Sequence, residues 1–280
     1  MQTTDKRIEE DIESFFLSPG GGYTKGADTY DAELGLYANT LIDFIQRTQP
    51  KTWACFVNGY RMNAKRKFCH SFDKACDEEG LLSVLRHGFK HRSLHFRVCY
   101  FKPESAFNHA SVELWAHNKV ECYRQWYYSA DMKKSVDMVL ALNGIPVFAF
   151  ELKNQYTGQT VDNAKRQWMY DHDPHEVCFQ FNKRILAYFC VDHTEVWMTT
   201  KLAGPNTYFM PFYQDSNGRE TKNVSNPDGY PTSYLWETVF QKDSMMDIIQ
   251  NCMSLQDGET LIFPQYQQLD AVHRLLADVE

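Results

Sequence analysis

Apolar residues recur at helical spacing near both ends of the chain and at strand spacing in its middle. Helices are predicted over residues 5–17, 31–46, 161–170, 234–253 and 266–279. Strands are predicted over residues 95–101, 120–128, 136–142, 147–153, 184–192 and 195–202. The stretch 203–233 is rich in Gly, Pro, Asn and Ser and indicates a long loop. Strands that cluster between flanking helices indicate a mixed α/β fold.

The most informative stretch is residues 135–154, SVDMVLALNGIPVFAFELKN, in which Asn143-Gly144 joins two apolar strands and predicts a hairpin. Charged residues interrupt these strands at Asp137, Glu151 and Lys153. An unpaired buried charge costs roughly several kcal/mol, so the three groups should pair with one another, line a cleft or bind a metal. Strand alternation places Glu151 and Lys153 on one face of the sheet.

The position of Asp137 depends on the turn. A two-residue loop places it opposite Phe150, whereas a three-residue loop places it opposite Glu151. A metal site needs the second register, or a bulge that achieves the same alignment. Two carboxylates and a backbone carbonyl suit Mg²⁺, which keeps several waters and lowers the pKa of a bound one. Taken alone, the same spacing also fits a surface hairpin with a salt bridge.

Composition narrows the choice of function. The 280 residues are 43% hydrophobic and 23% charged, which excludes a collagenous or wholly disordered chain. The net charge is -7, so any contact with DNA must come from a local basic surface. No apolar run approaches the ~20 residues that span a bilayer, and the first residues lack a signal-peptide pattern, so we expect a cytoplasmic protein. The eight cysteines form no CxxC pair, which favours reduced thiols over a zinc site.

Further motifs make the chain resemble the N-terminal nuclease region of the restriction and motor subunit (HsdR) of type I restriction–modification enzymes, within the PD-(D/E)xK superfamily. The resemblance runs nearly end to end. It takes in GGGY (20–23), TQPKTW (48–53), LLSVLRHGFK (81–90), FKPES (101–105), VDMVLALNGIPVFAFELKNQYTGQTVDNAKRQW (136–168), VDHTEVWMTTKLAG (191–204) and PTSYLWETVFQKDSMMDII (231–249). LIFPQYQQLDAVHRLL (261–276) resembles the opening of the helicase motor, and no GxxxxGK[ST] loop is present.

The resemblance implies a restriction-endonuclease-like fold: a central mixed sheet flanked by helices, with an N-terminal helical lobe and a C-terminal helical linker. We expect the lobe over residues 1–92 and the nuclease core over 93–202. A loop and helical linker should span 203–260, and 261–280 should begin a motor domain that the chain does not complete.

The resemblance also implies roles for individual residues. Asp137 and Glu151 are expected to bind the metal, and Lys153 to be the catalytic lysine. An acidic residue of the first helix approaches the same site; the match places it best at Glu9, with Glu10 and Glu13 as alternatives. Gln167 matches a helical glutamine that contacts DNA or the site. The family often has Gln-Tyr followed by Asp-Arg-Asp-Pro, where this chain has Gln167-Trp168 and Asp171-His172-Asp173-Pro174, so Tyr170 is the substitute aromatic residue.

The implied activity is Mg²⁺-dependent cleavage of double-stranded DNA, with Mn²⁺ as a substitute. ATP-driven translocation is expected only in the full-length enzyme, together with methylation and specificity subunits. The alternative is an inactive module for DNA binding or assembly. Lysine and arginine side chains that could contact DNA phosphates lie at Lys133 and Lys134, in the segment 86–92, and in the segment 61–67 with Lys65, Arg66 and Lys67. For the segments 61–67 and 86–92, a helix face exposed to solvent is an equally good explanation. His172 and His175 form an HxxH pair without a further ligand nearby, so no zinc site is expected.

Overall fold

The computed structural model describes residues 6–103, 107–130, 134–214 and 223–277. At its centre lies a mixed sheet in the order β1-β4-β5-β6-β7-β8-β9. β1 is parallel to β4 and β6 is parallel to β7, whereas the other neighbours are antiparallel. The strands are β1 (Thr24–Lys25), β4 (Val120–Tyr127), β5 (Ser135–Leu142), β6 (Ile145–Leu152), β7 (Ala187–Val191), β8 (Val196–Thr199) and β9 (Met210–Pro211). The predicted mixed α/β fold is confirmed.

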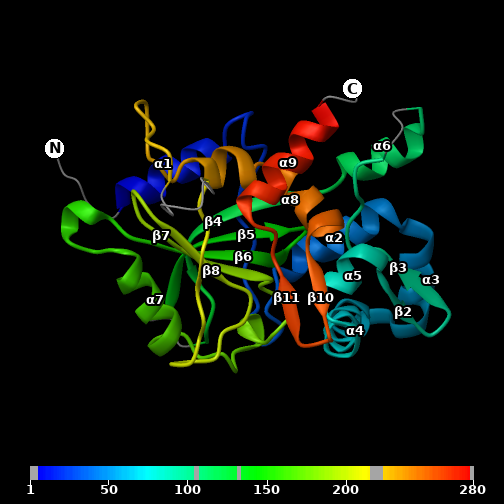
Figure 1. Ribbon diagram of the computed structural model, residues 1–280. Coiled ribbons are helices and arrows are strands. Elements are labelled where there is room, and N and C mark those ends of the chain that lie inside the picture. Colours follow the sequence, from blue (N-terminus) through cyan, green and yellow to red (C-terminus); the bar gives the residue numbers. More distant parts are fainter. Residues whose placement is uncertain (1–5, 104–106, 131–133, 215–222, 278–280) are drawn as a thin grey trace.

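Helices cover both faces of this sheet (Figure 1). On one face, α1 (Lys6–Phe16) packs its apolar stripe, including Ile12, against Met138 of β5 and Phe150 of β6. On the other face, α7 (Val161–Tyr170) buries Trp168 in a second apolar cluster with Val139. Alternate residues of β5 therefore serve two different cores, as the period of two in a strand requires.

A helical lobe with an aromatic core lies beside the sheet, on the right of Figure 1. It contains α2 (Ala38–Thr48), α3 (Pro50–Tyr60), the 3₁₀ turn η1 (Arg61–Asn63), α4 (Ala64–Glu79), α5 (Leu81–His87), β2 (Phe89–His91) and β3 (Leu94–Phe96). The predicted strand 95–101 is wrong in extent and place, because β3 pairs only with β2 and not with the main sheet. The predicted helix 31–46 instead begins at Ala38, because Gly35 has φ 64 and Asp31 bridges to Leu36.

The remaining elements are short helices, turns and strands that connect the main elements or follow the last strand of the sheet. They are α6 (His109–Ala116), the 3₁₀ turns η2 (Gln155–Thr157) and η3 (Val177–Phe179), the π-helical turns η4 (Leu235–Val239) and η5 (Ile248–Cys252), α8 (Lys242–Asp247), β10 (Ser254–Gln256), β11 (Thr260–Ile262) and α9 (Tyr266–Ala277). The helix predicted over 234–253 is interrupted at Gln241, whose ψ of 150 is extended. None of the helices within the described ranges is long and apolar enough to cross a membrane.

Candidate active site

The hairpin that carries the site turns through only two residues. Asn143 and Gly144 have φ 50 and φ 80, the left-handed values that a type I′ turn requires. Asn143 is fully buried: its Nδ2 donates to the carbonyl of Val98 at 2.9 Å, and its Oδ1 accepts from the amide of Lys119 at 2.7 Å. A Cβ on Gly144 would lie 2.4 Å from the carbonyl oxygen of Tyr37. Hydrogen bonds therefore hold Asn143 in place, and the backbone of Tyr37 leaves no room for a side chain at position 144.

A β-bulge follows the turn. Ala141 pairs with Pro146, but its neighbour Leu140 pairs with Phe148, so Val147 is the extra residue on β6. Such a bulge moves every later residue of one strand by one position relative to the other.

The bulge aligns the two acidic residues. Beyond it Met138 pairs with Phe150, and the next position in this register sets Asp137 beside Glu151. The sequence left two ways to reach this alignment, a longer loop or a bulge. The protein uses the two-residue turn together with the bulge.

Asp137, Glu151 and Lys153 meet at one point. The Lys153 Nζ lies 3.2 Å from Asp137 Oδ2 and 3.2 Å from Glu151 Oε2. The amide of Leu152 donates to Asp137 Oδ2 at 2.8 Å, which fixes that carboxylate. The side chains of Glu151, Lys153 and Asp137 are only 1%, 7% and 19% exposed. Two carboxylates and one ammonium therefore share a nearly dry corner of the sheet.

The electrostatics of this corner favour a further positive charge. Burial raises the pKa of Asp137 to about 7, and the adjacent Glu151 adds to the rise. Burial also raises the pKa of Glu151, although Lys153 opposes it. Burial would lower the pKa of Lys153, but the two carboxylates outweigh that effect and raise it. The ammonium balances one carboxylate and leaves the other uncompensated.

This donor set fits a hard divalent cation. The two carboxylate oxygens already converge on one cationic atom, the Lys153 Nζ. Within the described ranges, no group of three or more His, Cys, Asp or Glu side chains is arranged to hold a metal. Carboxylate oxygens are the ligands that hard divalent cations such as Mg²⁺ prefer.

Glu9 of α1 approaches the same corner from the helix side. Its side chain is buried, and the Gln125 Nε2 lies 3.1 Å from both of its oxygens. Arg124 adds an ion pair at 3.5 Å. Burial raises the pKa of Glu9, and its carboxylate interacts electrostatically with both Asp137 and Lys153.

The other two glutamates of α1 lie differently. Glu10 is 57% exposed and reaches Arg124 only at 3.8 Å. Glu13 is bridged to Arg124 at 3.2 Å and to Lys25 at 3.3 Å. Of the three candidates, the structure brings Glu9 to the site.

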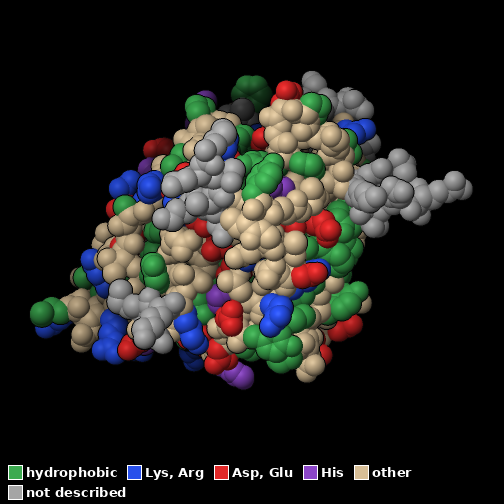
Figure 2. Space-filling model, turned by 90° about the vertical axis from the view of Figure 1, so that its left-hand side faces the viewer, with side chains coloured by type: hydrophobic (Ala, Val, Ile, Leu, Met, Phe, Trp, Pro, Cys, Tyr) green, Lys and Arg blue, Asp and Glu red, His purple; other side chains and the backbone are tan. Residues whose placement is uncertain are grey.

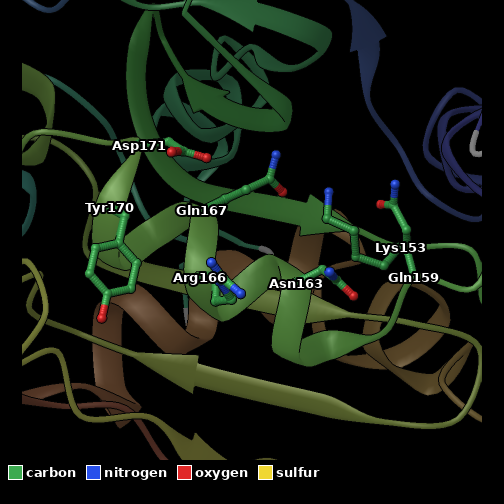
Figure 3. Close-up of a pocket in the computed structure, with 7 residues that line it drawn as sticks. All are labelled: Lys153, Gln159, Asn163, Arg166, Gln167, Tyr170 and Asp171. Carbon is green, nitrogen blue, oxygen red and sulfur yellow. The ribbon is translucent and has the colours of Figure 1, made fainter.

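Gln167 of α7 lies with Lys153 in one pocket (Figure 3). Its Oε1 is buried and has no hydrogen-bond partner among the residues that the structure describes. In Figure 3 its amide lies between Asp171 and Lys153, whereas the ring of Tyr170 points away from Lys153 at the far end of the group. Tyr170 is also 64% exposed. The structure therefore brings Gln167 to the site but leaves Tyr170 at its edge.

His172 belongs to the site although the sequence pattern did not place it there. Its Nε2 lies 2.8 Å from Glu151 Oε1, and its Nδ1 lies 2.8 Å from the hydroxyl of Tyr128. Burial lowers the pKa of His172 to about 4. His175 instead has a 91% exposed side chain and pairs with Asp173, so the HxxH residues do not face each other. The one signal in the sequence was the departure from the family pattern at position 172.

The predicted phosphate contacts fall in different places. Lys134 directly precedes β5, and Lys133 lies outside the described residues. Lys65, Arg66 and Lys67 are exposed on the first turn of α4, in the helical lobe and far from α7 in Figure 1.

Arg86, in the basic segment 86–92, has an internal role: it donates to the carbonyls of Ile249 and Met253, both at 2.7 Å. On the face shown in Figure 2, basic, acidic and histidine side chains are interspersed with uncharged surface.

A comparison with known protein families finds a match to this chain. Residues 108–231 match the family described as the type I restriction enzyme R protein N terminus. That span includes Asp137, Glu151, Lys153, Gln167 and His172, whereas Glu9 precedes it. The chain has no match among the curated proteins. The converging carboxylates and lysine lie inside the matched span, so this part of the chain is similar to the N terminus of type I restriction enzyme R proteins, as its motifs predicted.

Proposed function

We propose that this chain cleaves double-stranded DNA in a Mg²⁺-dependent reaction, as the nuclease region of a type I restriction enzyme R protein. The observation that carries the proposal is the convergence of Asp137 and Glu151 on the Lys153 Nζ, at 3.2 Å each, inside the span that matches the family. A salt-bridged surface hairpin would have no reason to bury these three charges, because a buried ion pair gains little over an exposed one.

Each residue has a distinct task in this proposal. Asp137 and Glu151 would hold the ion, which when bound supplies a water of lowered pKa and offsets charge on the phosphate oxygens. Lys153 would then be released from one carboxylate, and its ammonium would orient the attacking water and offset charge that develops on the phosphate. Glu9 would hold a further negative charge beside the site. The unpaired Gln167 Oε1 would accept a hydrogen bond from a water or from DNA.

The complete enzyme involves more than this chain. We propose that it acts with methylation and specificity subunits, and that recognition of a DNA sequence lies in those partners. ATP-driven translocation would lie in a motor that this chain does not contain, since the chain has no GxxxxGK[ST] loop. Mn²⁺ should substitute for Mg²⁺ because it accepts the same oxygen ligands.

The test is plasmid cleavage by the complete enzyme across a Mg²⁺ titration, with Asp137→Ala, Glu151→Ala and Lys153→Ala. Each variant should abolish cleavage, because each removes a different element of one displacement, and ATP hydrolysis should persist. Asp162→Ala is the control, since that carboxylate is 82% exposed on α7. Cleavage at the wild-type rate by any of the three would overturn the role given to that residue. A wild-type enzyme that binds DNA but never cuts it, with either ion, would favour the inactive module.

A further inference from the structure

A buried chain of hydrogen bonds runs from Tyr128 through His172 to Glu151. Tyr128 directly follows the last residue of β4 and is fully buried. His172 follows α7 and is 5% exposed. The two contacts of the imidazole are both 2.8 Å, one on each ring nitrogen. Three separate segments of the chain thus meet through one histidine.

The ring of His172 is held by packing as well as by hydrogen bonds. Its centroid lies 4.6 Å from that of Trp168, 5.4 Å from that of Tyr128 and 5.7 Å from that of Phe179. Aromatic walls on several sides leave little freedom for the ring to turn. A side chain that is buried and clamped in this way can impose an orientation on the group to which it is bonded.

The directions of the hydrogen bonds follow from the chemistry of the partners. A carboxylate that holds a cation, as proposed for Glu151, is ionised and can only accept, so the Nε2 of His172 must carry the proton that it donates to Glu151. A neutral imidazole has one proton, which leaves Nδ1 as an acceptor for the hydroxyl of Tyr128. The tyrosine hydroxyl then donates to Nδ1 and supports the tautomer that can donate to the glutamate.

The two oxygens of Glu151 consequently have separate partners. Oε1 is bonded to His172, and Oε2 is 3.2 Å from Lys153 on the side of Asp137. A carboxylate on a strand can rotate about its last torsion, and the bond to His172 removes that freedom. Residues that orient a ligand in this way typically change metal affinity or activity by about 10- to 100-fold when they are replaced.

We propose that His172 is a positioning residue that holds the Glu151 carboxylate with Oε2 facing Asp137 and Lys153, and that the hydroxyl of Tyr128 supports the tautomer of this histidine that donates to Glu151. The inference rests on the proposed function, in which Glu151 binds the ion. His172 touches neither the ion nor DNA in this arrangement and acts only through Glu151.

Three variants separate orientation from packing. His172→Phe keeps a ring in the aromatic cage but removes both nitrogens. His172→Gln keeps an N–H donor for Glu151. Tyr128→Phe removes only the hydroxyl. His175→Gln is the matched control, because this histidine lies three residues further on and is exposed.

Isothermal calorimetry of the chain with Mg²⁺ alone gives the first readout. We expect His172→Phe to weaken binding by roughly 10- to 100-fold. His172→Gln should recover most of the affinity, and His175→Gln should match the wild type. Wild-type affinity in His172→Phe would overturn the proposal. Equal losses in His172→Phe and His172→Gln would also overturn it, because the ring and not its donor would then matter.

Nitrogen-15 NMR of histidine gives a second readout, and its main measurement uses only the metal-free wild-type chain. It should show His172 as the Nε2–H tautomer, and Tyr128→Phe should admit the other tautomer. An Nδ1–H tautomer in the wild type would overturn the proposal. Absence of Mg²⁺ binding by the wild-type chain would contradict the proposed function instead, and the tautomer would still decide whether His172 donates to Glu151.

Discussion

Asp137→Asn should make the metal-free protein more stable at neutral and higher pH while it removes activity. The side chain has the same shape, and its oxygen can still accept from the amide of Leu152 and from Lys153, as Asp137 Oδ2 does now. What the substitution removes is a buried negative charge beside Glu151. Active sites commonly carry such costs, because function and stability make different demands on the same residues.

The magnitude follows from the pKa of Asp137, which burial and Glu151 raise from 3.8 to about 7. A difference of about 3 pH units at ~1.4 kcal/mol for each corresponds to about 4 kcal/mol. The folded state binds the proton more tightly than the unfolded state, so the free energy of unfolding falls as pH rises from about 4 to about 7. Because Asp137, Glu151 and Lys153 titrate together, we expect about 2–4 kcal/mol at pH 8.

The assay is urea denaturation in EDTA at pH 4 and pH 8. The variant and the wild type should have nearly equal free energies of unfolding at pH 4, where Asp137 is mostly protonated, and the variant should be the more stable at pH 8. Added Mg²⁺ should then stabilise the wild type only. Glu78→Gln, which removes an exposed partner of Lys74, should change little at either pH. A variant that is less stable than the wild type at pH 8, or a difference that does not vary with pH, would refute the electrostatic argument.

Three further predictions concern the turn, the motor and DNA. Gly144→Ala should lower the free energy of unfolding by about 3 kcal/mol in urea denaturation, because its Cβ meets the carbonyl of Tyr37 at positive φ. Gly158→Ala, with φ 77 and nothing within 4 Å, should cost only about 1 kcal/mol; equal losses would contradict the steric explanation. Calorimetry should detect no ATP binding, since the sequence has no GxxxxGK[ST] loop to hold the phosphates; micromolar affinity would mean that the motor boundary is misplaced. Binding to DNA should be weak, unspecific and steeply salt-dependent in a titration series, and a preference for one sequence would assign recognition to this chain.

Local patterns in the sequence were sufficient to predict the secondary-structure elements that carry the site. The Asn143-Gly144 signal predicts the hairpin because φ values above zero suit these two residues. The predicted helix 161–170 agrees with α7, whose Thr160 caps its start. Three charged residues in otherwise apolar strands indicated the corner where Asp137, Glu151 and Lys153 meet, because burial without partners is costly. Each inference rests on residues that are close together along the chain.

Other features of the site are set by contacts between segments that are distant along the chain, and only the tertiary structure shows them. The bulge at Val147 is established only by the pairing of β5 with β6, although Pro146 beside it lacks a backbone N–H and is a residue typical of bulges. The choice of Glu9 over its neighbours is made by Gln125, which lies 116 positions further along the chain. His172, in the turn that follows α7, meets Glu151 of β6, which lies 21 positions earlier in the chain. A sequence records which groups are costly to bury, whereas the packing of remote segments determines which partner each of them meets.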